Sequence, residues 1–105
     1  IARQSGVLLS LDESALPVKP RVRAVCDLLG FDPLYVANEG KLLAVVAAEC
    51  AEGLVAQMRA HPLGRQAAVI GTVEAGEPGR VRMKTVVGGM RLVEMLAGEQ
   101  LPRIC

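Results

Sequence analysis

The chain has 105 residues, of which 51% are apolar and 22% are charged, and its 12 basic and 11 acidic side chains leave a formal charge of +1. A chain of this length forms one small domain, and the apolar fraction excludes intrinsic disorder. The charge near zero and the presence of only two aromatic residues, Phe31 and Tyr35, argue against nucleic acid as a partner. Such a partner needs a basic surface or several stacking rings.

The cysteines and the apolar runs indicate the cellular compartment in which the protein works. Cys26, Cys50 and Cys105 cannot all pair within one chain, and no cysteine or histidine cluster has the spacing of a zinc site. The longest apolar run, 42–48, is too short to cross a bilayer. We therefore expect no membrane partner and a reduced, cytoplasmic setting.

The first third of the chain predicts a strand and a helix. Residues 1–6 are typical of a helix that ends in a turn, so we expect a piece cut from a longer protein. The apolar run 6–11 predicts a strand. From Pro20 the apolar residues recur at helical spacing, with Gly30 directly after the last of them. Proline suits the first helical turn and glycine the position after the end, so the pattern predicts a helix over 20–29.

The middle of the chain predicts two strands and a second helix. The runs 34–37 and 41–47 are interpreted as strands joined by the turn Asn38-Glu39-Gly40. The second run is apolar on both faces, which is typical of a central strand. Residues 49–61 have helical spacing, and His61-Pro62 ends that pattern.

The last third predicts strands at 67–75, 80–87 and from residue 90 to 96, with Gly71 as a candidate β-bulge. Three basic side chains alternate along the second of these runs, and a solvated face is favoured over anion binding: Arg80, Arg82 and Lys84. The predicted fold is α+β, a mixed β-sheet with helices packed on one face.

Cys105 is the most distinctive candidate for chemistry. We expect a domain over residues 1–97, followed by a flexible tail over 98–105 that ends in this thiol. The seven residues from Gly98 to Ile104 reach roughly 23 Å when extended, so the tail could carry a thiol from one site to another. From the residues alone, an equally open interpretation is that Cys105 has no role and only marks the end of the chain.

Glu39 is the second candidate. A carboxylate at a corner between strands can point into a cleft and act as a base, although a solvated turn acid is the commoner meaning of this pattern. His61 has no second ligand at metal-binding spacing, and no phosphate-binding glycine loop or serine–histidine–acid set is present. The residues alone therefore do not predict a self-sufficient enzyme.

The ending Leu101-Pro-Arg-Ile-Cys105 closely resembles the C-terminal signature of the HypE family, the factors that make the cyanide ligands of [NiFe]-hydrogenases. Blocks at 15–20, 37–41 and 61–64 resemble blocks of the same family in the same order. HypE proteins have two domains and resemble the aminoimidazole ribonucleotide (AIR) synthetase, or PurM, superfamily. The resemblance implies that this chain is the second domain, with the AIR synthetase C-terminal fold and with the first helix of that domain truncated.

The resemblance also implies a function, an ATP-dependent carbamoyl dehydratase in the full-length protein. HypF would transfer a carbamoyl group to Cys105, ATP would drive its dehydration to a thiocyanate, and the cyanide would pass to iron on a HypC–HypD complex. Glu39 is the base that we expect, Asn38 and Lys41 would orient it or contact the phosphorylated intermediate, and Arg103 would position the tail. The N-terminal domain, absent here, would hold most ATP and Mg²⁺ contacts and form the homodimer, so the piece alone is expected to be inactive.

An alternative belongs to another functional class. The domain could be a non-catalytic interaction module that docks partner proteins, with Cys105 forming a mixed disulfide or contacting a metal. Transfer of a carbamoyl group to the thiol would separate the two hypotheses.

Overall fold

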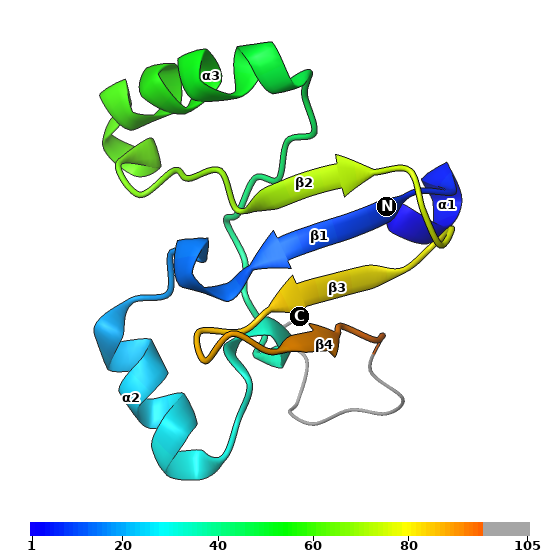
Figure 1. Cartoon of the computed structure of the whole chain (residues 1–105). Helices are drawn as coiled ribbons and strands as arrows, with labels where there is room; N and C mark the ends of the chain where they lie inside the picture. Colours follow the sequence, from blue (N-terminus) through cyan, green and yellow to red (C-terminus); the bar gives the residue numbers. More distant parts are fainter. Residues whose placement is uncertain (96–105) are drawn as a thin grey trace. The chain divides into compact units, whose positions relative to one another are not determined.

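The computed structural model describes residues 1–95 (Figure 1). These residues form two compact units, which are described separately: the first combines Ile1–Pro17 with Val45–Glu94, and the second contains Val18–Ala44. The elements of the first unit are α1 (Ala2–Ser5), β1 (Leu8–Asp12), the 3-10 turn η1 (Glu13–Ala15), α3 (Ala48–Ala60), η3 (Pro62–Gly64), β2 (Gly71–Glu74), β3 (Val81–Lys84) and β4 (Met90–Leu92). Those of the second unit are α2 (Pro20–Leu29) and η2 (Pro33–Tyr35).

A mixed four-stranded sheet organises the first unit, in the order β2-β1-β3-β4. Strand β1 is antiparallel to β2 and parallel to β3, and β4 is antiparallel to β3 (Figure 1). The first strand of the chain therefore lies between two strands from its last third. The predicted α+β class with a mixed sheet is confirmed.

The core of the first unit is small and aliphatic. Met83 of β3 is only 1% exposed and pairs in register with Leu11 of β1. Gly71 begins β2 in unbroken register with Leu11, so the predicted bulge is wrong. A Cβ atom at Gly71 would lie 2.2 Å from the carbonyl oxygen of Ser10, so the close approach of the two backbones requires glycine here.

Both predicted helices are confirmed. Helix α2 begins at Pro20 and ends before Gly30, whose φ of 70° places it in the left-handed region, as the pattern predicted. Helix α3 is shifted by one residue from the predicted range 49–61, and His61 follows its last residue. Cys26 of α2 is buried, in agreement with its place on the apolar side of the helical pattern.

The two strands predicted in the middle of the chain are wrong. The first overlaps η2, and Asp32 caps this turn by accepting a hydrogen bond from the Leu34 amide at 2.9 Å. Residues 41–47 are exposed and belong to no helix or strand. Apolarity on both faces predicts burial, but a strand also needs a neighbouring strand for its backbone hydrogen bonds, and no described segment supplies one here.

The strands of the last third are confirmed but shorter than predicted. Strand β3 stops at Lys84 because a turn follows at once: the Thr85 amide donates to the Gly89 carbonyl at 2.8 Å, and Gly88 has a φ of 89°. Arg82 is partly exposed, in agreement with the predicted solvated face, and it also forms an ion pair with Glu74. The predicted tail, residues 98–105, lies outside the described residues.

Candidate functional site

The predicted base and its neighbours lie on an exposed turn of the second unit. Asn38, Glu39 and Lys41 are all exposed, and Gly40 has a φ of 67°. This left-handed conformation, which favours glycine, turns the chain between Glu39 and Lys41. The turn therefore presents a carboxylate and an ammonium group to solvent within three residues. Cys105 and Arg103 lie outside the described residues.

A hollow of about 470 Å³ lies in the first unit, where the parallel strands β1 and β3 end. Asp12 and Lys84 are the last residues of these strands and are paired in register. The hollow is lined by Asp12, Ser14, Lys84, Thr85, Val86, Val87 and Gly88. The carboxyl ends of parallel strands are common places for ligands because the loops that follow them diverge.

Asp12 shapes one wall of this hollow. Its Oδ1 atom accepts hydrogen bonds from the Ser14 hydroxyl at 2.6 Å and from the Ser14 amide at 2.9 Å. These two bonds, with a smaller contribution from the charge of Lys84, hold the pKa of the Asp12 carboxyl below its ordinary value. Asp12 is therefore a carboxylate at neutral pH and caps η1 rather than taking up protons.

The two loops around the hollow are tied together. The Val86 amide donates a hydrogen bond of 3.0 Å to Oε2 of Glu13, so the turn after β3 is fixed to the turn after β1. The Thr85 hydroxyl oxygen accepts from the Gly89 amide at 3.0 Å and closes the second turn on itself. Hydroxyls, a carboxylate and an ammonium group line the hollow, which suits a small polar ligand.

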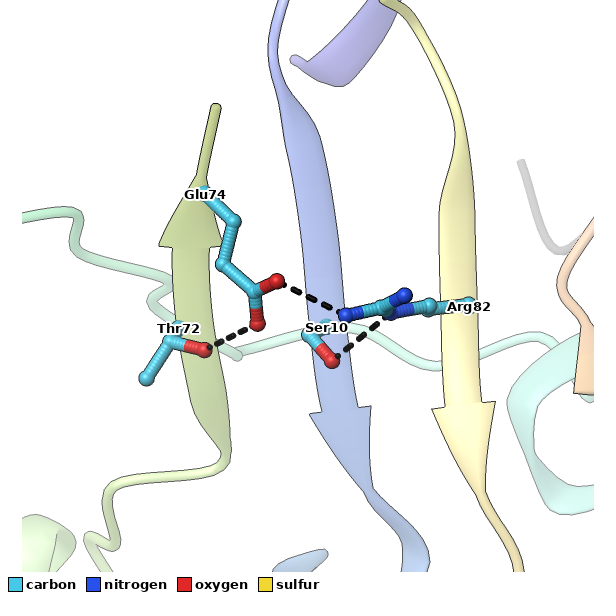
Figure 2. A network of polar contacts seen from close by, with 4 residues as sticks. All are labelled: Ser10, Thr72, Glu74 and Arg82. Carbon is cyan, nitrogen blue, oxygen red and sulfur yellow. Dashed lines mark hydrogen bonds and ion pairs between the residues drawn. The ribbon is translucent and has the colours of Figure 1, made fainter. Parts of the chain in front are cut away.

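A second polar cluster crosses the sheet (Figure 2). Arg82 of β3 donates from Nη2 to Oε2 of Glu74 at 2.7 Å and from Nε to the hydroxyl of Ser10 at 3.2 Å. Thr72 donates to the other oxygen of Glu74 at 3.1 Å. Because each group of this network has a partner on another strand or along its own, the network fixes the sheet and is not a reactive site.

The second unit carries an apolar groove of about 440 Å³ along α2. The groove is lined by Arg21, Val22, Val25, Cys26, Leu29, Phe31 and Val36. Apart from Arg21, these side chains offer no charge, so the groove suits apolar groups only.

Sequence reasoning missed the hollow and the network for one reason. The pairing of strands that are distant in the sequence brings Glu74 and Arg82 together with Ser10, which lies 72 residues before Arg82. No local sequence pattern shows how these strands pair. The one local signal was Asp12-Glu13-Ser14, in which an aspartate precedes a serine by two residues. That spacing is typical of an Asx turn.

The residues predicted for the site are thus brought together only in part. Asn38, Glu39 and Lys41 share one turn. Between residues 1 and 95, no group of three or more His, Cys, Asp or Glu side chains is arranged to hold a metal ion. No helix among the same residues is long and apolar enough to cross a membrane.

Residues 1–84 match the family model of the AIR synthase related protein, C-terminal domain. The chain belongs to this family. Individual relatives are named more specifically than this family. The chain is 62% identical over 105 residues to the carbamoyl dehydratase HypE of Azotobacter vinelandii, and 62% identical over 107 aligned positions to that of Cupriavidus necator. Both alignments cover all of this chain but only 31% and 30% of the relatives, so the chain spans about a third of their length.

Solved structures agree with these relatives. A crystal structure of the hydrogenase maturation protein HypE superimposes with a TM-score of 0.91 at 47% identity, and covers 99% of this chain and 34% of its own. A HypE structure in complex with ATP gives 0.89 at 46% identity, with 99% and 32% covered. A chain of a HypE–HypF complex gives 0.80 at 36% identity, with 89% and 30% covered. The resemblance inferred from the sequence is confirmed.

Proposed function

We propose that this chain is the C-terminal domain of an ATP-dependent carbamoyl dehydratase that makes the cyanide ligands of [NiFe]-hydrogenases. The observation that carries the proposal is the 62% identity, over the whole chain, to a relative named carbamoyl dehydratase HypE. Because the chain spans about a third of that relative, the complete activity belongs to a longer protein that works in the cytoplasm.

Cys105 is the carrier in this proposal. HypF transfers a carbamoyl group. The Cys105 thiol gives up its proton, its sulfur bonds to the carbamoyl carbon, and the bond between that carbon and the donor held by HypF breaks, which gives a thiocarboxamide. The domain over residues 1–97 holds the tail over 98–105, whose reach takes the thiol from HypF to the ATP site. A relative has been solved in complex with HypF, which supports this partner.

Glu39 is the base in the dehydration. The γ-phosphoryl group of ATP moves to the amide oxygen, ADP leaves, and the nitrogen loses its first proton. Glu39 then takes the second proton from the nitrogen while the C–O bond breaks and phosphate departs, so the thiocyanate S–C≡N remains. The exposed position of Glu39 on the Gly40 turn leaves its carboxylate accessible to a substrate brought by the tail. A HypE structure in complex with ATP supports the nucleotide.

Three neighbouring groups assist in this proposal. Lys41 is exposed two residues after Glu39 and would contact the phosphorylated intermediate, whose negative charge its ammonium group stabilises. Asn38 orients the Glu39 carboxylate, and Arg103 positions the tail. The N-terminal domain of the longer protein supplies most ATP contacts, the Mg²⁺ that neutralises phosphate charge, and the homodimer interface. The cyanide finally passes to iron on a HypC–HypD complex: a two-electron reductant on that complex cleaves the S–C bond, and Cys105 returns to a thiolate.

Mass spectrometry of the intact full-length protein tests the proposal. Incubation with HypF, carbamoyl phosphate and ATP should add the mass of one carbamoyl group and then remove the mass of one water. Cys105→Ala should abolish the addition, whereas Cys50→Ala, at an exposed cysteine of α3, should leave it unchanged. Full carbamoylation of the Cys105→Ala variant would show that another residue is the carrier, and would favour the interaction module.

A further inference from the structure

The turn that carries the proposed base lies close behind η2 in the chain. Glu39 follows the last residue of η2 by four positions, whereas the next helix, α3, begins nine positions after Glu39 and belongs to the first unit. Residues 37–46 are all exposed and form no helix or strand. The nearest element of regular structure to Glu39 is therefore η2, and the position of the carboxylate depends on how firmly η2 is held.

Asp32 holds η2 together from its first end. Its Oδ1 atom accepts a hydrogen bond from the Leu34 amide at 2.9 Å, and its backbone carbonyl accepts one from the Tyr35 amide at 3.0 Å. Pro33 begins the turn with a φ that its ring already restricts, and it has no amide hydrogen that needs a partner. Because the side-chain bond is partly buried, water replaces it poorly, so removal of the Asp32 carboxylate should loosen the turn.

The turn η2 is in its turn placed on α2. The Phe31 amide donates to the Cys26 carbonyl at 2.8 Å, so the chain leaves the helix in a fixed direction. The turn lies against α2, and Val36, directly after it, lines the same apolar groove as the buried Cys26. The backbone is thus anchored from the end of α2 to Val36, and Glu39 follows three residues later.

The two steps proposed for the carbamoyl group differ in their need for this anchor. Proton transfer requires the Glu39 carboxylate within hydrogen-bond reach of the nitrogen, and a small displacement of a reacting group lowers the rate by a large factor. Transfer of the carbamoyl group to Cys105 does not use Glu39. A loosened η2 should therefore slow dehydration alone, whereas general damage to the fold would slow both steps.

We infer that Asp32 is a positioning residue for the dehydration. Its carboxylate caps η2, η2 anchors the turn at Gly40 to α2, and that turn places the Glu39 carboxylate. The inference rests on the proposed function, in which Glu39 is the base. Asp32 acts through the backbone between Leu34 and Glu39, so its hydrogen bond matters and its charge does not.

Time courses of the intact mass of the full-length protein, with HypF, carbamoyl phosphate and ATP, give the rates of the two steps separately. Asp32→Ala should slow the loss of water roughly fivefold, as expected for the loss of a typical cap, and should leave the gain of the carbamoyl group within about twofold. Asp32→Asn should restore the loss of water to within about twofold of the unchanged protein, because its amide oxygen can accept the same bond from Leu34.

His61→Ala is the matched control. Nδ1 of His61 caps η3 in the first unit in the same manner, at 3.2 Å from the Leu63 amide. Loss of this cap should slow neither step, because η3 does not precede the turn that carries Glu39.

The outcomes separate the inference from the proposed function. Normal dehydration by Asp32→Ala, equal slowing of both steps, equal slowing by His61→Ala, or an Asp32→Asn variant as slow as Asp32→Ala would each overturn the positioning role and leave the proposed function intact. An unchanged protein that gains no carbamoyl group, or never loses water from it, would reject the proposed function and the inference together.

Val36→Ala provides a second test that does not depend on the folding of Asp32→Ala. This variant keeps the cap on η2 but shortens the side chain that follows the turn into the groove along α2. It should slow the loss of water and leave the gain of the carbamoyl group unchanged. Dehydration by Val36→Ala at the rate of the unchanged protein would overturn the inference.

Discussion

Nη2 of Arg82 lies 2.7 Å from Oε2 of Glu74, so an ion pair joins β3 to β2 over the intervening strand β1 (Figure 2). The strands that carry the two residues are not neighbours in the sheet. Ser10 of β1 lies between them and accepts a hydrogen bond from the same guanidinium group. The side chain of Arg82 thus links three strands, whereas backbone hydrogen bonds link only neighbouring strands in pairs.

The first prediction concerns this connection. Arg82→Ala should lower the free energy of unfolding by about 1 kcal/mol, since the pair is 41% and 37% exposed and water screens part of the attraction. Arg80→Ala should cost less, because the Arg80–Glu77 pair joins residues three apart and is 52% and 74% exposed. Urea unfolding of the two variants provides the measurement.

A double-mutant cycle sharpens this test. Arg82→Ala and Glu74→Gln should show a coupling of roughly 0.5–1 kcal/mol, which salt should reduce. Additive effects of the two substitutions would mean that the ion pair does not contribute to the stability of the sheet.

The second prediction concerns Asp12. Its folded-state pKa lies below its ordinary value, so the carboxylate stabilises the fold at pH values above the unfolded-state pKa, and this contribution is lost as pH falls through the folded-state pKa. Ser14→Ala removes the hydroxyl bond and should raise the pKa partway, because the Ser14 amide still donates. NMR titration of the Asp12 side-chain carbon measures it. Ser10→Ala should leave that titration unchanged, and an unaltered curve for Ser14→Ala would show that the hydroxyl is not the main cause.

The third prediction uses two glycines with opposite surroundings. Gly64→Ala should destabilise the fold by roughly 1–3 kcal/mol, because the new methyl group would overlap the Met58 carbonyl. Gly53→Ala should instead stabilise it by up to about 1 kcal/mol, because Gly53 lies inside α3 with open space around it. Thermal unfolding shows whether each variant is more or less stable than the unchanged protein. Destabilisation by Gly53→Ala would contradict the helical assignment at that position.

The fourth prediction concerns the proposed base. In the full-length protein with HypF, carbamoyl phosphate and ATP, Glu39→Gln should stall at the carbamoylated species, because glutamine cannot take the nitrogen proton. Glu52→Gln, at an exposed glutamate of α3, is the matched control and should give a normal yield of thiocyanate. A normal yield from Glu39→Gln as well would exclude Glu39 as the base.

The fold could be predicted where a local signal sets local structure. Pro20 and Gly30 marked both ends of α2, and the apolar spacing of α3 located it within one residue. The run 41–47 was wrongly predicted to be a strand. Its apolar character is a property of the single residues, whereas a strand also needs a second segment at hydrogen-bonding distance. No property of those residues in sequence states whether such a segment exists.

For the site, the sequence could predict which residue types take part but not how they are arranged. The turn at Gly40 was correct in position, and the exposure of Glu39 agrees with a solvated turn acid, the commoner meaning of its pattern. The hollow between Asp12 and Lys84 could not be predicted at all, because it depends on the parallel register of β1 and β3. Register between distant segments is set by tertiary packing, which single-chain patterns do not encode.

The central place of β1 in the sheet has a consequence for how the protein is made. Residues 8–12 leave the ribosome well before their partners in β2 and β3, which begin only at Gly71 and Val81. Closing such a long loop delays sheet formation, so both edges of β1 stay unpaired until β2 and β3 have been synthesised. Folding of the first unit is therefore completed only after Lys84 has emerged, and a chaperone that binds nascent chains would find its target in Leu8–Leu11.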